Sequence, residues 1–290
     1  MLSHPTLPQR VAVAAYSKLP ESVSEAAAIN TWLQSRGIET VHSALDDAGL
    51  RRRVSAKDVD LFIAVGGDGT VIRSAHLCAP LGIPILGIKL GRVGFLIQVH
   101  QQEWHTALEN LLKGEYWIES RMMLRADHVA ENGKVRGSWH ALNEAAVCRG
   151  EQVRPVRLAA SVDGHHLTTY VCDGLIASTP TGSTAYALAS GGPILPPELR
   201  NILLVPIAPH LSVDRAVVFS EGSNLSLQVV EGSAVLSVDG QAAIPVPPGE
   251  SVNVRAGEFP ALFVRFGDAG YFYRNLTAHM NQNPSIGMPR

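Results

Sequence analysis

The stretch VDLFIAVGGDGTVIRSA, residues 59–75, combines a strand, a glycine turn and the start of a helix in a single run. The residues before the glycines, VDLFIAV, are mostly apolar and predict a buried β-strand. GGDGT follows at residues 66–70, and a helical pattern begins directly after it. A strand that leads through a tight turn into a helix is the repeating unit of a parallel α/β sheet. The stretch therefore predicts an α/β fold around itself.

The sequence on either side of this stretch repeats the alternation. Apolar runs at residues 10–16 and 83–88 predict two more strands. Residues 21–36 and 102–113 have the spacing of amphipathic helices, and each is followed by a glycine that can end the helix. We therefore predict a Rossmann-like parallel sheet with covering helices for residues 1–119.

Residues 120–266 have a strand-like period instead. Apolar and polar side chains alternate at residues 156–163, 225–229 and 252–255, which is typical of strands with one buried face. Dipeptides that favour hairpin turns separate such runs, namely Asn132-Gly133, Asp163-Gly164 and Asp239-Gly240. These patterns predict a β-rich antiparallel second domain, interrupted by a short helix at residues 181–190.

Composition and charge narrow the class of protein. The formal net charge is -2, so the chain has no basic excess with which to bind a nucleic acid. Its 3 cysteines lack the spacing of a metal site or a disulfide scaffold, which favours a reducing compartment. The sequence contains neither a signal peptide nor an apolar run long enough for a membrane helix. We expect a cytoplasmic protein that binds neither membranes nor nucleic acid.

The glycine turn predicts a phosphate-binding site. Successive backbone N–H groups and the positive end of the following helix both attract phosphate, and Thr70 is placed to cap that helix. Asp68 is unusual there, because a carboxylate repels phosphate unless a divalent cation or a hydroxyl donor offsets its charge. A tight turn in which Asp68 accepts local N–H bonds is the alternative interpretation.

Two further segments have chemistry suited to a nucleotide. Asn143 and Glu144 supply donors and acceptors for sugar hydroxyls, although an ordinary surface pair would have the same sequence. Residues 173–194, DGLIASTPTGSTAYALASGGPI, are dense in hydroxyl and glycine residues. Small residues allow a flat ligand to approach the backbone, Tyr186 can stack on a base, and Asp173 can accept from an amine or amide. A linker loop with a short helix is the alternative for this segment.

Taken together, these segments resemble the NAD kinases. GGDGT, LNEAA at residues 142–146 and the segment 173–194 occur in the order and spacing of that family. GGDGT alone is also similar to loops of lipid kinases and phosphofructokinases, whereas the third segment is highly specific. The resemblance extends from Arg10 to about Leu276. Further matching motifs are LGRVGFL at 90–96, RMML at 121–124 and VDGQ at 238–241.

The resemblance implies ATP-dependent phosphorylation of the adenosine ribose 2′-hydroxyl of NAD, giving NADP. Mg²⁺ is expected mainly through the nucleotide phosphates rather than through metal ligands of the chain, and polyphosphate is an alternative donor. The family fold implies a C-terminal helix that returns to the first domain. The predicted domains are a kinase domain, residues 1–119 with the tail 267–290, and an NAD-binding domain, residues 120–266. A homodimer or homotetramer is expected.

The resemblance also implies roles for individual residues. Asp68 would act as general base toward the 2′-hydroxyl, while Asn143 and Glu144 would hold ribose hydroxyls. Asp173 would recognise an amide or amine edge. The turn residues expected around the phosphates are Gly66, Gly67, Gly69 and Thr70. The other expected substrate contacts are Arg73, Arg154, Thr184, Ala185, Tyr186, Ala189, Ala208 and Gln241.

The chain departs from the family pattern at several positions. Lys89 replaces a usual asparagine, where it either adds a phosphate contact or is merely exposed. The segment 208–218, APHLSVDRAVV, is shortened and altered, and Val171 leaves the preference between NAD and NADH open. A lipid or sugar kinase and a non-catalytic nucleotide sensor are the rival interpretations. The presence of Asp68 disfavours the sensor, because a binding module gains nothing from an anion beside phosphates.

Overall fold

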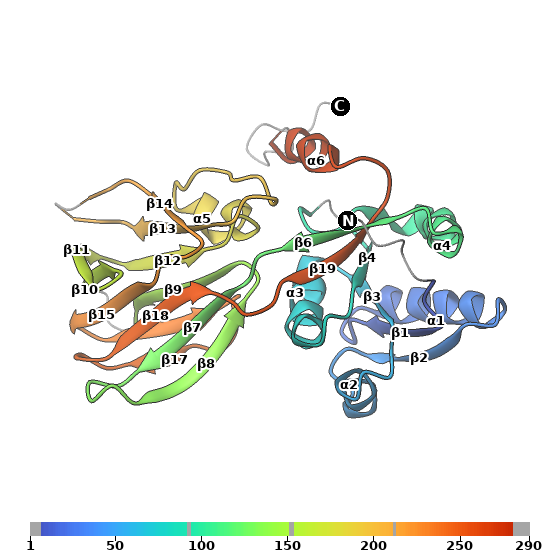
Figure 1. Ribbon diagram of the computed structural model, residues 1–290, viewed down its shortest axis with the longest axis horizontal. Coiled ribbons are helices and arrows are strands. Elements are labelled where there is room, and N and C mark those ends of the chain that lie inside the picture. Colours follow the sequence, from blue (N-terminus) through green and yellow to red (C-terminus); the bar gives the residue numbers. More distant parts are fainter. Residues whose placement is uncertain (1–6, 92–93, 151–153, 211–212, 281–290) are drawn as a thin grey trace. The chain divides into compact units, whose positions relative to one another are not determined.

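The computed structural model describes residues 7–91, 94–150, 154–210 and 213–280 (Figure 1). The chain divides into two compact units. Unit 1 comprises Met1–Ser120 and Ala261–Arg290, and unit 2 comprises Arg121–Pro260. Within the described part of the chain, no helix has both the length and the apolar character needed to cross a membrane.

Unit 1 is built on a seven-stranded sheet in the order β2-β1-β3-β4-β19-β6, with β5 paired to β4. The pairings of β1 with β2 and β3, and of β4 with β3, β5 and β19, are parallel. Every residue of β3 is buried, as expected for a central strand covered on both faces. The predicted parallel sheet is thus confirmed. Its strands are β1 (Arg10–Ala15), β2 (Glu39–Ala44), β3 (Leu61–Gly66), β4 (Ile85–Lys89), β5 (Val99–His100), β6 (Trp117–Arg121) and β19 (Ala261–Arg265).

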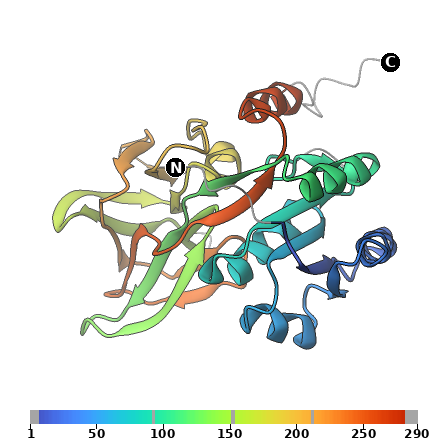
Figure 2. The same cartoon turned by 45° about the vertical axis from the view of Figure 1, so that its right-hand side comes forward.

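Helices cover both faces of this sheet (Figure 2). Apolar side chains of α1 (Pro20–Gln34) and α4 (Trp104–Lys113) share one core cluster with β1, β3 and β4. On the other face, Val71 of α3 (Asp68–Cys78) lies against the backbone of Gly87 in β4. The predicted C-terminal helix is α6, and it belongs to unit 1. The remaining helical elements of the unit are α2 (Ala48–Ser55), α6 (Tyr271–Met280), η1 (Ala79–Leu81) and η2 (Gln101–Glu103).

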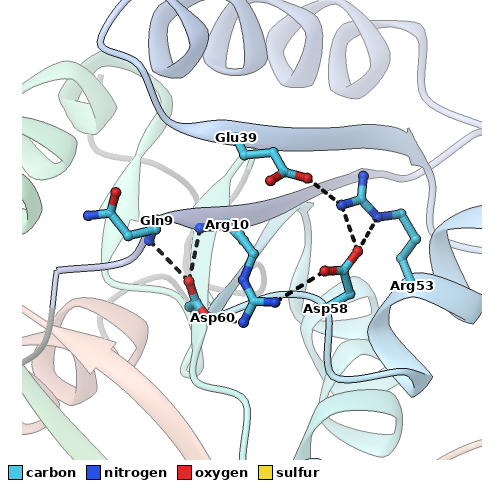
Figure 3. Close-up of polar contacts among 6 residues, drawn as sticks. All are labelled: Gln9, Arg10, Glu39, Arg53, Asp58 and Asp60. Atoms are coloured by element: carbon cyan, nitrogen blue, oxygen red, sulfur yellow. Dashed lines mark hydrogen bonds and ion pairs between the residues drawn. The ribbon is translucent and has the colours of Figure 1, made fainter.

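Ion pairs connect the amino ends of the first three strands of unit 1 (Figure 3). Asp60 accepts hydrogen bonds from the guanidinium of Arg10 at 2.7 Å and from its backbone N–H at 2.9 Å. Asp58 accepts from Arg10 and from Arg53, which also reaches Glu39 on β2. Hydrogen bonds from Arg53 and Arg10 lower the pKa values of Asp58 and Asp60 respectively. Ion pairs thus connect the strands at this amino edge of the sheet. The glycine turn follows β3 and lies at the opposite, carboxyl edge.

Unit 2 consists of two six-stranded antiparallel sheets, as the alternating pattern predicts. Their orders are β11-β10-β15-β18-β7-β8 and β14-β13-β12-β9-β16-β17. Both sheets contribute to one core cluster, which includes Leu158 of the first and Leu175 of the second. The strands are β7 (Leu124–Val129), β8 (Val135–Ala141), β9 (Glu144–Arg149), β10 (Val156–Val162), β11 (His165–Cys172), β12 (Gly174–Ser178), β13 (Asn201–Ile207), β14 (Val217–Ser220), β15 (Leu225–Glu231), β16 (Ala234–Val238), β17 (Ile244–Val246) and β18 (Ser251–Ala256).

The helix predicted at residues 181–190 is shorter and interrupted. A 3-10 turn, η3 (Gly182–Thr184), is separated from the short helix α5 (Tyr186–Ala189) by Ala185. The backbone of Ala185 has φ -106° and ψ -125°, outside the helical region. The break therefore makes Tyr186 the first residue of a new turn rather than the middle of a continuous helix.

Candidate active site

The glycine turn at the end of β3 has the strand-to-helix geometry expected of it. Gly66 has φ +153°, and a Cβ on it would lie 2.5 Å from Oγ1 of Thr70, so only glycine fits there. Gly67 is the N-cap of α3, and Asp68 is the first helical residue. The expectation that Thr70 caps this helix is wrong, because Thr70 lies inside the first turn and is buried against Gly66.

The other two glycines of the turn leave the backbone accessible. A Cβ at Gly67 or Gly69 would have no described atom within 4 Å. There is therefore room beside the start of α3, where the N–H groups of the first turn and the positive end of the helix dipole can attract an anion. Arg73, one turn further along, is exposed. Its Nε donates to the Gly69 carbonyl at 3.2 Å, and its guanidinium lies 5.1 Å from the centre of the Tyr16 ring.

The two carboxylate oxygens of Asp68 have different surroundings. Oδ2 accepts a hydrogen bond of 2.9 Å from the backbone N–H of Phe95. Oδ1 is buried and has no hydrogen-bond partner among the described residues. The carboxylate lies over the backbone of Gly94, where a Cβ would be 2.1 Å from Oδ1. Gly94 and Phe95, both in the LGRVGFL motif, thus hold Asp68 in place.

Lys89 lies beside this carboxylate. It is the last residue of β4, and its register partner on β3 is Gly66. Its Nζ is 3.8 Å from Oδ1 of Asp68, and its side chain is 3% exposed. Burial lowers the pKa of Lys89, while the neighbouring Asp68 acts in the opposite direction. Of the two roles expected for Lys89, the merely exposed one is wrong.

A buried ionic cluster that no sequence pattern predicts holds the segment that contacts Asp68. Nε of Arg265 donates to Glu119 at 2.8 Å, and its NH1 donates to the carbonyl of Leu96 at 3.0 Å. The hydroxyl of Tyr271, in α6, donates to the same Glu119 carboxylate at 2.9 Å. Leu96 follows Phe95 directly, so this cluster fixes the segment that holds Asp68.

In unit 2, the Asn143-Glu144 segment is held by an aspartate from another part of the chain. Asp239 accepts hydrogen bonds from the backbone N–H groups of Leu142, Asn143 and Glu144 at 2.7, 2.8 and 3.0 Å. Asp239 has φ +48°, a conformation that aspartate tolerates better than most residues. Asp239 belongs to the VDGQ motif, and the sequence predicts only a hairpin turn at Asp239-Gly240. Its structural role toward residues 142–144 was not predicted.

The hydroxyl-rich segment is packed tightly against Asn143. Oγ1 of Thr179 donates to the Leu142 carbonyl at 2.6 Å and accepts from the N–H of Gly182 at 3.0 Å. A Cβ at Gly182 would lie 2.2 Å from the Asn143 carbonyl oxygen. The second and third sequence motifs therefore form one compact structure, and Gly182 is required by this close approach.

Glu144 is buried, and its Oε2 has no hydrogen-bond partner within the described chain. Burial raises its pKa to about 8, repulsion by Asp239 adds to the rise, and the Tyr186 backbone N–H opposes it. Glu144 is therefore protonated at neutral pH. A neutral carboxyl group can both donate and accept, which suits a hydroxyl ligand.

Tyr186 lies close to Glu144, and its hydroxyl is also influenced by Asp173. The Tyr186 side chain is 43% exposed. Burial of its hydroxyl raises the pKa of Tyr186, and Cys148, Asp173 and Glu144 each add to that rise. Asp173 forms an ion pair with Nε of Arg149 at 3.1 Å, a contact not predicted from the sequence. The hydroxyl of Tyr186 thus lies near polar groups, and because the residue is partly exposed its ring can stack on a base.

The other predicted contact residues are half-buried or exposed. Thr184 donates to the Thr181 carbonyl at 3.1 Å, and Ala185 is half-buried. Ala208 has φ +44°, an unfavourable conformation for alanine. The N–H of Gln241 donates to the Val238 carbonyl at 3.0 Å. Exposed residues of this set are Arg154, Ala189, Ala208 and Gln241.

In the described ranges, no group of three or more His, Cys, Asp or Glu side chains is arranged to hold a metal ion. Asp68 is the carboxylate at the anion-binding turn, and a single carboxylate together with substrate phosphates is a usual way to bind Mg²⁺. The donor set at the turn is thus compatible with an ion that arrives with a phosphorylated ligand.

Family models match both parts of the chain. The model of the ATP-NAD kinase N-terminal domain matches residues 12–116, and the model of the ATP-NAD kinase C-terminal domain matches residues 142–266. Curated relatives agree. The NAD kinase of Heliobacterium modesticaldum is 39% identical over 275 residues, covering 91% of this chain and 95% of the relative. That of Chloroflexus aggregans is 37% identical over 277 residues, covering 95% and 99%.

Solved structures share the fold. The crystal structure of an NAD kinase from Archaeoglobus fulgidus in complex with ATP superposes with a TM-score of 0.75 at 28% identity, covering 94% of this chain and 99% of that chain. Yeast NADH kinase complexed with NADH gives a TM-score of 0.84 at 22% identity, covering 98% and 91%. The chain therefore shares its fold with a solved NAD kinase and a solved NADH kinase.

Proposed function

The chain belongs to the NAD kinase family of phosphotransferases, and we propose that it transfers the γ-phosphoryl group of ATP to the adenosine ribose 2′-hydroxyl of NAD, giving NADP. The observation that carries the proposal is the placement of Asp68. Its carboxylate lies at the tip of the glycine turn. Oδ2 is anchored by the Phe95 N–H, and Oδ1 has no hydrogen-bond partner among the described residues, although Nζ of Lys89 is 3.8 Å away. A carboxylate that keeps an oxygen without a hydrogen bond can accept the proton of a sugar hydroxyl.

Asp68 acts as general base in this scheme. A bond forms between the ribose 2′-oxygen and the γ-phosphorus, the bond to the β,γ-bridging oxygen breaks, and ADP leaves. The hydroxyl proton passes to the Asp68 carboxylate. Because phosphoryl transfer has a loose transition state, the proton is accepted late and the main contribution of Asp68 is orientation.

The open N-terminus of α3 binds the donor phosphates. A Cβ at Gly67 or Gly69 would meet no described atom within 4 Å, so there is room beside the start of the helix, and Arg73 is exposed one turn away. The complex of the Archaeoglobus fulgidus relative with ATP supports ATP as the donor. Mg²⁺ supplies charge neutralisation when bound, and Asp68 with the nucleotide phosphates is the donor set that suits it.

Unit 2 binds NAD. Glu144, neutral at pH 7 because of its raised pKa, and Asn143 hydrogen-bond ribose hydroxyls. Tyr186 stacks on a base with its exposed ring. Asp173, oriented by Arg149, accepts from an amide or amine edge. The preference between NAD and NADH, assembly as a homodimer or homotetramer, and a cytoplasmic location stay predictions.

Substitution of Asp68 by Asn is the direct test. Asn keeps the shape of the side chain but removes the charge and the proton acceptor, so we expect NAD binding to persist and turnover to fall by a factor of about 10² to 10⁴. NADP formation is measured with ATP or polyphosphate as donor and with NAD or NADH as acceptor. Chelation of divalent cations should abolish the activity. Wild-type turnover by Asp68→Asn would show that the base is elsewhere.

A further inference from the structure

Lys89 is an unusual residue for its position. Lysine is almost never fully buried unless it is paired, yet the Lys89 side chain is 3% exposed. Its place at the carboxyl end of β4, next to Gly66 of β3, puts it at the same sheet edge as the anion-binding turn. Its burial therefore needs a partner, and the chain offers a nearby one in Asp68.

The geometry of this pair is that of a charge contact rather than a hydrogen bond. Nζ of Lys89 is 3.8 Å from Oδ1 of Asp68, which is too long for a hydrogen bond. Oδ1 consequently makes no hydrogen bond to Lys89, while the positive charge stays close to it. Oδ2 is fixed separately by Phe95.

Other titratable groups lie on the elements next to β4, but they have other partners. His100, the register partner of Lys89 on β5, accepts a hydrogen bond from the backbone N–H of Glu103 with its side chain. The guanidinium of Arg265, on β19, binds Glu119 and the Leu96 carbonyl. Asp68, on α3, is the charged group that acts on the pKa of Lys89. The pairing with Asp68 is therefore the dominant electrostatic relation of this lysine in the described structure.

A general base at this position creates an electrostatic problem. The carboxylate of Asp68 lies at the same turn that binds the donor in the proposed function. The triphosphate of ATP carries several negative charges, so the carboxylate and the triphosphate repel each other. The positive end of α3 offsets part of this repulsion. An ammonium group close to Oδ1 offsets more of it without occupying the oxygen.

We propose that Lys89 is a positioning residue that compensates the charge of Asp68, so that the triphosphate donor binds beside the catalytic carboxylate. The proposal rests on the proposed function of Asp68 as the general base. Lys89 acts through Asp68, not through a phosphate contact of its own. Its effect on donor binding must therefore depend on the presence of the carboxylate.

A double-mutant cycle tests this dependence. Binding of the non-hydrolysable analogue β,γ-imido-ATP is measured by calorimetry, at fixed ionic strength and Mg²⁺, for the wild type, Lys89→Met, Asp68→Asn and the double variant. We expect Lys89→Met to weaken binding about tenfold when Asp68 is present and less than about threefold in the Asp68→Asn background. Lys89→Arg, which keeps the charge, should stay within about threefold of the wild type.

Controls separate this effect from loss of folding. Lys89→Gln retains a polar side chain and should behave as Lys89→Met does, and thermal unfolding confirms that each variant is folded. Lys113→Met, which removes an exposed lysine of α4 in the same unit, should leave binding unchanged. An equal loss in both backgrounds, or no loss in either, would overturn the proposal.

The same measurements distinguish failure of the role proposed for Lys89 from failure of the proposed function. A wild-type protein that forms NADP but shows no coupling between Lys89 and Asp68 overturns the inference alone. A wild-type protein that binds no ATP analogue overturns the inference together with the proposed function. A large coupling in binding supports Lys89 as a positioning residue whatever the turnover number is.

Discussion

At the residue scale, Asp68 keeps its position because Gly94 has no side chain. The Asp68 carboxylate occupies the space where a Cβ on Gly94 would be, 2.1 Å from Oδ1 and 2.3 Å from Oδ2. Contacts shorter than 3 Å cannot persist, so any larger residue must push the carboxylate away. The placement of Asp68 thus depends on a glycine far from it in the sequence.

Gly94→Ala should therefore reduce turnover while the protein stays folded. A displacement of about 1 Å at a reacting group costs roughly 100-fold in rate, and we expect a loss of that order with little change in NAD affinity. Steady-state kinetics and calorimetry measure the two quantities. Gly222→Ala is the matched control, because a Cβ there would have no described atom within 4 Å. Unchanged turnover in Gly94→Ala would show that Asp68 does not need its observed position.

Glu144 makes a different residue-scale prediction, because it titrates near neutral pH. Its pKa is raised from 4.5 to about 8, so the folded state holds the proton more tightly than the unfolded state does. Glu144 therefore contributes stability that is fully present below pH 4.5 and is lost as the pH rises toward 8. Glu144→Gln, which cannot ionise, should become progressively more stable than the wild type over this range.

Thermal or urea unfolding between pH 5 and pH 9 measures this difference. The pKa change corresponds to an upper bound of about 5 kcal/mol in the free energy of unfolding. The difference between Glu144→Gln and the wild type should grow up to about pH 8 and then stay constant. A difference that does not vary with pH would contradict a protonated Glu144 in the folded protein.

Sequence patterns identified the residues of the site better than they identified their neighbours. Asp68, Asn143 and Glu144 stand in motifs whose chemistry is visible locally. Asp239 could not be assigned its role, because Asp-Gly has an ordinary interpretation as a hairpin turn and its bonds go to backbone groups 95 to 97 residues away. The burial of Lys89 was equally hidden, since lysine is normally exposed.

At the element scale, helices and strands with strong apolar patterns were predicted, whereas the polar strand β2 was missed. β3 and α4 have continuous or amphipathic apolar patterns and occur where expected. β2 is an edge strand without a fully buried residue, so it lacks the periodicity on which prediction depends. Its position is set by pairing with β1 and packing against α1, which a local pattern does not contain.

The buried cluster of Arg265, Glu119 and Tyr271 joins β19, β6 and α6 in unit 1. Removing one member of a buried ion pair leaves the other charge uncompensated, at a cost of about 3 to 5 kcal/mol. We expect Glu119→Gln to lose stability of that order. Tyr271→Phe removes one hydrogen bond, and its loss should be about 1 to 2 kcal/mol.

Urea unfolding curves for the two variants measure this ordering, and turnover provides a second readout. Because Arg265 also holds the Leu96 carbonyl at 3.0 Å, Glu119→Gln should lower turnover more than Tyr271→Phe does. If Tyr271→Phe were the more damaging change, the cluster would owe its stability to the hydrogen bond of the Tyr271 hydroxyl rather than to the ion pair.

At the scale of the whole molecule, unit 2 is an insertion into unit 1. The chain leaves unit 1 after β6 and returns to it with β19, and these two strands are neighbours in one sheet. The sequence interpretation placed residues 261–266 with the second domain, because an apolar strand carries no sign of the sheet to which it belongs. Unit 2 has its own core cluster, formed from both of its sheets.

This organisation predicts that Arg121–Pro260 folds on its own. A closed hydrophobic core between two antiparallel sheets is sufficient for a domain of this size, so the isolated segment should unfold in one cooperative transition. Because Asn143, Glu144, Asp173 and Tyr186 all lie within it, it should also bind NAD, whereas Asp68 is missing and no NADP can form. Circular dichroism, thermal unfolding and calorimetry with NAD measure these properties. A segment that folds cooperatively but binds no NAD, while the full chain does bind it, would show that the nucleotide site requires residues of unit 1.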